Sequence, residues 1–280
     1  MPSPLDLLEL SFLREALAEV LLLGTAGGVL GAWIVLRRLA FFTHAAGSAT
    51  FPGLVAADAS GVSPTLAGLA VALGYAGGVE RAGRAGREPA EATALLLVAA
   101  LATGIVLASD VFESSAGVDR LLFGTLLGLG PGDLALSAAT VVLAGAGSLA
   151  LGRTWAALAF DPDGAAALGL PAARADLLLL GLVAVAAAAA LPAVGALLVA
   201  AVFVLPAAAA RLVTHTVPSL LGCSVVFALA EGLAGLYAAY WLDLPPGPPV
   251  ALIGALVYGA LAAASGIHGR RAGSALAGTA

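Results

Sequence analysis

The chain has 280 residues, of which 61% are hydrophobic and only 10% charged, and its formal net charge is −5. Soluble domains carry about 25% charged residues, so this chain lacks the polar side chains needed to cover a water-soluble globule of its size. The composition excludes a soluble enzyme, argues against nucleic acid as a partner, and predicts an all-α polytopic membrane protein.

Apolar stretches of about 20 residues recur along the chain, each long enough to cross roughly 30 Å of hydrocarbon. The expected spans cover residues 16–36, 41–60, 62–80, 91–109, 132–152, 174–191, 194–213, 217–240 and 249–267. Segment 41–60 is weakly apolar and could be short or partly re-entrant. Segment 174–213 could be one helix broken at Pro192, with Gly195 following. We therefore expect eight or nine spans in a single membrane domain over residues 1–280.

The positions of the arginines predict the orientation. If the first span ends in the cytoplasm, only Arg14 and Arg120 lie outside. The others fall inside: Arg37, Arg38, Arg81, Arg84, Arg87, Arg153, Arg174, Arg211, Arg270 and Arg271. By the positive-inside rule, the N-terminus is external and the C-terminus cytoplasmic, as in a multi-pass plasma-membrane protein. The acidic start of the chain does not resemble a signal peptide, and the small polar tail at about 270–280 is expected to be disordered.

Small residues spaced for close helix contact recur in the predicted spans. The pairs Gly24–Gly28, Gly27–Gly31, Gly74–Gly78 and Gly124–Gly128 each form a GxxxG pattern. In membranes such patterns let helices approach closely, although chance matches are common in a chain rich in glycine and alanine. Together they favour a tightly packed bundle.

The sequence F-D-P-D-G-A-A-A-L-G-L-P, beginning at Phe160, predicts a short helix over about 161–169 in a loop between two spans. Asp161 is a suitable N-cap, Pro162 suits the first helical position and Asp163 complements the helix dipole. Gly169 ends the helix. About two turns are too short to be stable alone in water. The segment needs a partner surface, which is either the bundle itself or another protein. An ordinary capped loop helix is the alternative interpretation of this local pattern.

Five motifs resemble the membrane-spanning permease subunit of the ABC importers for zinc, manganese and related metals. They are G-V-L-G-A-W-I-V-L-R-R-L-A-F-F-T-H-A-A-G-S-A-T-F-P-G (28–53), L-F-G-T-L-L-G-L-G-P-G-D-L (122–134), F-D-P-D-G-A-A-A-L-G (160–169), V-G-A-L-L-V-A-A-V-F-V-L-P-A-A-A-A-R (194–211) and L-D-L-P-P-G-P-P-V (242–250). The resemblance implies that the loop helix is a coupling helix that docks on an ATPase subunit. Phe160, Asp161, Asp163, Ala166 and Gly169 match its pattern.

The chain itself has no nucleotide-binding loop. It contains no lysine, and the phosphate-binding pattern G-x-x-x-x-G-K-[ST] needs one. ATP hydrolysis must therefore come from another polypeptide. The single cysteine, Cys223, excludes an internal disulfide and a CxxC metal site.

The resemblance also implies a metal path along the second span. Metal importers of this family resemble one another in an Asp and a His four residues apart, a spacing that places both on one helix face. This chain has His44 and Ser48 at the matching positions, so one strong ligand remains of two. Two copies of the pair would offer a weak, transient site for a cation such as zinc. Alternatively, His44 only forms a hydrogen bond at the end of the span.

Two acids complete the predicted path. Glu231 lies in the middle of a predicted span, where a charged side chain costs about 2.5–3.5 kcal/mol on insertion scales and should face a cavity or a partner. It is the only acid that we expect deep in the bundle. Three roles are open for it: a cation ligand, a protonated hydrogen-bonding group or a dimer contact. Asp58 is expected near the outer mouth, where acids raise the local cation concentration. The other acids expected there are Asp110, Glu113, Asp119 and Asp243.

The sequence thus predicts a non-enzymatic permease with no permanently bound cofactor and a divalent cation as cargo. Its expected partners are ABC ATPase subunits, an extracytoplasmic metal-binding protein, a second copy of the chain and membrane lipid. A permease of the same build for a chelated or organic solute, and a secondary transporter, remain alternatives. An intramembrane protease is disfavoured because neither H-E-x-x-H nor G-x-S-x-G occurs.

Overall fold

The computed structural model describes residues 11–111, 124, 129–196 and 198–277. Regular secondary structure within these ranges is entirely helical. The helices are α1 (Ser11–Leu36), α2 (Ala40–Ser48), α3 (Phe51–Ser60), α4 (Pro64–Arg84), α5 (Pro89–Val111), α7 (Pro131–Phe160), α8 (Pro162–Ala167), α9 (Ala172–Val194), α10 (Val199–Val213), α11 (Val217–Leu242) and α12 (Gly247–Ala277). The predicted all-α bundle is confirmed for this part of the chain.

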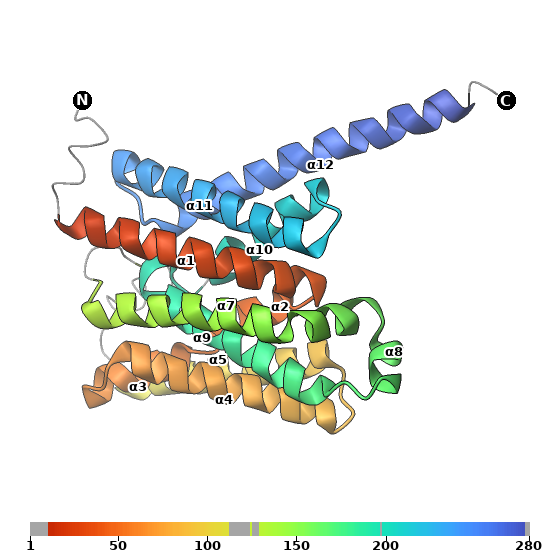
Figure 1. Cartoon of the computed structure of the whole chain (residues 1–280). Helices are drawn as coiled ribbons and strands as arrows, with labels where there is room; N and C mark the ends of the chain where they lie inside the picture. Colours follow the sequence, from red (N-terminus) through yellow and green to blue (C-terminus); the bar gives the residue numbers. More distant parts are fainter. Residues whose placement is uncertain (1–10, 112–123, 125–128, 197, 278–280) are drawn as a thin grey trace.

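Helix α1 runs through the middle of the bundle, between α11 on one side and α7 on the other (Figure 1). Its glycines allow this position. A β-carbon at Gly28 would come within 2.4 Å of the α-carbon of Val225 in α11, and one at Gly31 within 2.2 Å of the carbonyl oxygen of Phe203 in α10. Because real β-carbons do not approach so closely, the helix backbones are in direct contact there, as the small-residue pattern predicts.

The other glycine patterns behave differently. A β-carbon at Gly74 would meet nothing within 4 Å, and one at Gly78 would meet only the side chain of Leu96. The spacing of Gly74 and Gly78 therefore marks no close backbone contact between described helices. Gly128 lies outside the described residues, so the pattern that it forms with Gly124 stays a prediction.

Six helices are long and apolar enough to cross a membrane, judged by length and composition among the described residues. They cover Leu13–Leu36, Pro89–Ser109, Pro131–Phe160, Ala172–Val194, Val217–Leu242 and Gly247–Ser265. Helix α10 is apolar but shorter, and α4 is not among the six. The chain is therefore a multi-pass membrane protein.

The segment predicted as a span over 41–60 is two short helices, α2 and α3, and not one continuous helix. The break falls at Ala49 and Thr50. The Thr50 hydroxyl donates a hydrogen bond to the carbonyl of Gly47 at 2.5 Å. The second helix begins at Phe51, with Pro52 in its first turn. Since proline has no N–H, it cannot extend the hydrogen-bond ladder of α2.

The predicted break at Pro192 is also misplaced. Pro192 lies inside α9, which continues to Val194 and ends at Gly195 with φ 82°. That positive φ is accessible to glycine at little cost, so glycine and not proline ends the helix. Helix α10 begins at Val199, which gives two separate helices.

The tail expected to be disordered from about residue 270 is helical as far as Ala277, because α12 continues through it. Alanines at 272, 275 and 277 favour helix. Figure 1 shows α12 leaving the bundle toward the C-terminus.

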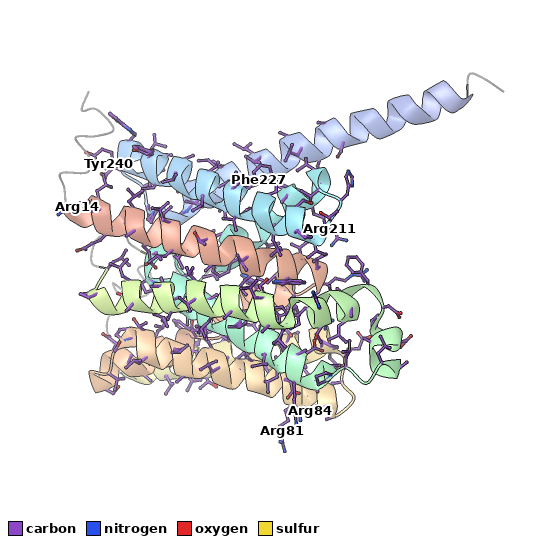
Figure 2. The ribbon with its side chains drawn as sticks, viewed as in Figure 1. Arg14, Arg81, Arg84, Arg211, Phe227 and Tyr240 are labelled. Carbon is purple, nitrogen blue, oxygen red and sulfur yellow. The ribbon has the colours of Figure 1, made fainter. Side chains whose placement is uncertain are left out.

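The two ends of the bundle differ in charge. Figure 2 shows Arg81, Arg84 and Arg211 at the end where α8 also lies, while Arg14 and Tyr240 are at the opposite end. The first of these is called the α8 end below. Arg120, Glu113 and Asp119 lie outside the described residues.

Candidate functional site

The loop between α7 and α9 forms the predicted short helix, α8, which covers Pro162–Ala167. Asp161 caps it, since its Oδ1 accepts a hydrogen bond from the backbone N–H of Gly164 at 2.9 Å. Gly169 ends the turn with φ 70°. The local predictions for Asp161 and Gly169 are thus confirmed, and residues 160–169 are called the α8 segment below.

The α8 segment presents large apolar side chains at its ends. Phe160 is 68% exposed and Leu168 80% exposed, whereas Ala165 is only 2% exposed and packs on the bundle. Asp161 and Asp163 are exposed, and the side chain of Ala166 is outside the described ones. Because a six-residue helix is unstable alone, exposed apolar side chains beside it favour a partner protein at this surface.

The predicted path residues of the second span lie together on α2. His44 is half-buried, and Ser48, one turn later, is 7% exposed. Helix α2 packs against α9 and α10. At Gly47 a β-carbon would come within 3.2 Å of the carbonyl oxygen of Ala196. The helix that carries His44 and Ser48 therefore rests on the turn between α9 and α10.

Glu231 is buried in α11, at 4% exposure, as the sequence predicts for an acid in a membrane helix. It lies against α12, where a β-carbon at Gly254 would come within 2.7 Å of Glu231 Oε2. Its Oε1 is buried and has no hydrogen-bond partner among the described residues. Gly254 is thus the residue that leaves room for this carboxyl group.

The structure does not gather the predicted path residues into one metal centre. No group of three or more His, Cys, Asp or Glu side chains close enough to hold a metal occurs among the described residues. Asp58 is exposed on α3, and Glu231 faces α12. A complete cation site would need groups in addition to this pair, since one imidazole and one hydroxyl are few ligands for a divalent metal.

A second buried acid, Glu19 in α1, was missed, so the prediction that only Glu231 lies deep in the bundle is wrong. Glu19 is 0% exposed, and its Oε1 accepts a hydrogen bond from Ser137 Oγ of α7 at 2.7 Å. Its Oε2 has no partner among the described residues. The predicted span began at residue 16, which placed Glu19 near the membrane surface, whereas α1 begins at Ser11. A predicted span that began earlier in the chain would have placed Glu19 inside the membrane and marked it as a buried acid.

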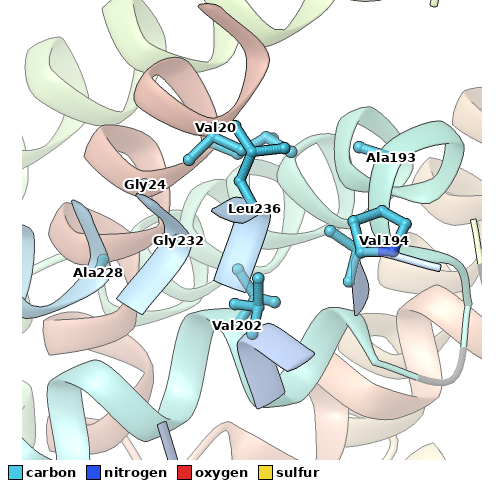
Figure 3. Close-up of a pocket in the computed structure, with 11 residues that line it drawn as sticks. Val20, Gly24, Ala193, Val194, Val202, Ala228, Gly232 and Leu236 are labelled. Atoms are coloured by element: carbon cyan, nitrogen blue, oxygen red, sulfur yellow. The ribbon is translucent and has the colours of Figure 1, made fainter. Parts of the chain in front are cut away.

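A small pocket of about 30 Å³ lies between α1, α9, α10, α11 and the beginning of α12 (Figure 3). All its lining residues are apolar or glycine, among them Val20, Val194, Val202 and Leu236. Since divalent cations require oxygen, nitrogen or sulfur ligands, this pocket is not a cation site.

The architecture and the sequence identify the family. Residues 9–264 match the model of the ABC 3 transport family. The chain belongs to this family. As a member of this family it is a membrane transport component and not itself a catalytic enzyme, and the ATPase is a separate subunit.

Several proteins are similar in sequence to most of this chain. This chain is 32% identical over 250 residues to the Thermotoga maritima protein named "Probable metal transport system membrane protein", covering 89% of this chain and 88% of the relative. It is 30% identical over 259 residues to the manganese transport system membrane protein MntC of Halalkalibacterium halodurans, covering 90% and 87%. Among solved structures, PsaBC from Streptococcus pneumoniae has the same fold, with a TM-score of 0.80, 24% identity and coverage of 91% and 92%.

Proposed function

We propose that this chain is the membrane-spanning subunit of an ABC importer for a divalent metal cation. The observation that carries the proposal is the α8 segment, a capped helix with Phe160 and Leu168 exposed beside it. It provides a surface on which a separate ATPase subunit docks. The cargo is inferred from the relatives, two of which are named for metal and for manganese transport.

The arrangement in the membrane follows from the charges. The arginine-rich α8 end faces the cytoplasm, where the ATPase is, and the N-terminus faces outward. We expect α4, α10 and the α2–α3 pair to lie within the membrane in addition to the six long apolar helices, which brings the number of spans to the eight or nine expected. An extracytoplasmic binding protein delivers the cation to the outer mouth, near Asp58, in the plasma membrane.

The cation path requires a second copy of the chain. His44 and Ser48 of one copy offer one imidazole and one hydroxyl, and a second copy doubles this set. Such a site binds a cation weakly, so the cation is released readily when the path opens inward. Glu231 is a further candidate ligand or dimer contact, because its Oε1 has no hydrogen-bond partner among the described residues.

Metal accumulation in cells tests the cargo. Cells that lack the gene should accumulate less manganese or zinc when that metal is scarce, and the wild-type gene should restore it. A His44→Ala gene should restore less than the wild type. Normal accumulation of every divalent metal in the deleted strain would contradict a metal cargo.

A chelated or organic solute is the second candidate cargo. The observation that favours it is Ser48, which stands at a position where the metal importers that this chain resembles have a strong metal ligand. In that case uptake of the chelate, and not of the free cation, should require this chain.

A further inference from the structure

An ion pair joins α1 to the helix that follows the α8 segment. Arg37 Nη2 and Asp176 Oδ1 are 2.5 Å apart, and the two residues are 139 positions apart in the sequence. Arg37 directly follows the last residue of α1, and Asp176 lies in the first turns of α9. The side chains are 15% and 38% exposed. A partly buried pair of this kind is costly to break on one side only, since it leaves the other charge without a partner.

Two tryptophans, one in α7 and one in α1, add further contacts near the beginning of α9. Trp155 Nε1 in α7 donates a hydrogen bond to the carbonyl of Ala175, the residue before Asp176, at 2.9 Å. The rings of Trp155 and Trp33 in α1 are in edge contact, with centroids 5.4 Å apart. The beginning of α9 is therefore fixed to α7 on one side and to α1 on the other, close to the α8 segment.

A short link connects this cluster to the predicted path helix. Only Arg37, Arg38 and Leu39 separate α1 from α2, which carries His44. Arg38 has φ 58°, an unusual conformation for a residue with a side chain. The backbone N–H of Leu39 bonds the carbonyl of Ile34 at 2.8 Å. The link is thus short and held in one conformation, so a displacement of Arg37 is passed directly to α2.

Open space beside the pair allows it to move. A cavity of about 840 Å³ at the α8 end is lined by Arg37, Asp176, Phe42 and Glu80, among others. The beginning of α9 and the beginning of α2 both border this cavity. Helices α2 and α9 pack against each other elsewhere, and at the edge of the cavity the ion pair joins α9 to the α1–α2 link.

We propose that the Arg37–Asp176 pair transmits the movement of the α8 segment to α2, and so couples ATP hydrolysis to opening of the cation path. The inference rests on the proposed function. Arg37 and Asp176 are positioning residues, because they act on the path through the α1–α2 link and touch neither nucleotide nor cargo. The physical basis is that the pair is a polar contact that joins the beginning of α9, the helix that follows the α8 segment, to this link.

The test compares hydrolysis with transport in the complete complex. Wild-type, Arg37→Gln and Asp176→Asn chains are reconstituted in proteoliposomes with the ATPase subunits and the binding protein, and manganese uptake per ATP hydrolysed is measured. Residues that contact neither ligand can change the coupling between distant sites, so we expect the single variants to keep ATPase binding and hydrolysis while uptake per ATP falls about tenfold. The exchanged pair Arg37→Asp with Asp176→Arg should restore most of the loss.

The Arg87–Glu91 pair provides a matched control. Arg87 borders the same cavity, but its partner Glu91 is only four positions away, and both side chains are 57% exposed. Glu91→Gln should therefore leave uptake per ATP unchanged. If it lowers the ratio as much as Asp176→Asn, or if the single variants keep the wild-type ratio, the coupling inference is overturned.

Misfolded variants can be distinguished from variants that lose only the coupling of hydrolysis to uptake. If the single variants lose ATPase binding and hydrolysis together with uptake, and the exchanged pair does not recover them, the pair is only structural and the inference is overturned. Absence of ATP-dependent uptake of both manganese and zinc by the wild-type complex would instead overturn the proposed function, and the inference with it. The wild-type measurement thus separates the two failures.

Discussion

The bundle interior around α1 and the α8 segment are built on opposite principles. In the interior, helix backbones touch at Gly28 and Gly31, and Glu19 is wholly enclosed. In the α8 segment a six-residue helix holds its shape by its caps and exposes Phe160 and Leu168. Substitutions in the two regions should therefore have different effects. Substitutions in the interior should change the stability of the chain, whereas substitutions in the α8 segment should change partner binding and leave the bundle intact.

The largest effect is expected for Gly31→Ala. The added methyl group would lie 2.2 Å from the carbonyl oxygen of Phe203, so α1 and α10 must separate. Overpacking of this kind costs about 1–3 kcal/mol, and we expect the upper end because the contact is with backbone. Thermal unfolding in detergent measures it. Gly74→Ala is the control, since nothing lies within 4 Å of that site; equal melting temperatures for the two variants would contradict the packing of α1.

Phe160→Ala should have the next largest effect, and on binding alone. Central apolar side chains in interfaces contribute about 2 kcal/mol or more, which corresponds to roughly thirtyfold weaker binding of the ATPase subunit. The melting temperature of the chain should stay at the wild-type value, because Phe160 is 68% exposed. Co-purification and a titration with the ATPase subunit measure the change. Unchanged affinity would contradict the assignment of this surface.

Asp161→Ala should weaken ATPase binding less. Loss of the N-cap hydrogen bond to Gly164 destabilises a helix by about 1 kcal/mol, so α8 is formed for a smaller fraction of the time. The same titration measures the effect. Asp161→Asn is the matched control, because asparagine also caps helices. If the alanine and asparagine variants bind equally, capping does not determine docking.

The smallest effect is expected for Glu19→Gln. Glutamine has the same shape and keeps an oxygen to accept the hydrogen bond from Ser137. Thermal unfolding should therefore stay within about 0.5 kcal/mol of the wild type, the usual range for a change that leaves packing and hydrogen bonding in place. A loss as large as that of Gly31→Ala would show that a negative charge is required at this position.

What the sequence predicts depends on the range of the interactions involved. The caps of the α8 segment, Asp161 and Gly169, act within a few residues, so their pattern is visible in the chain. The division of 41–60 into two helices also depends on local features, the Thr50 hydrogen bond and Pro52. A prediction from the average apolarity of the whole segment does not detect this break.

Long-range contacts are the part that sequence could not supply. Arg37 and Asp176 are 139 positions apart, and nothing in either segment identifies the other as its partner. The burial of Glu19 depends in the same way on Ser137 of a distant helix. The family resemblance predicts that the α8 segment is a docking helix, but it does not reveal how the segment is joined to the rest of the bundle.

Uptake of manganese into proteoliposomes is the most direct test of the central claim, that a separate ATPase drives this chain through the α8 segment. We expect uptake only when the ATPase subunits, ATP and an intact α8 segment are all present, and a strong reduction for Phe160→Ala. Uptake by the purified chain alone, at the rate of the complete complex, would contradict it.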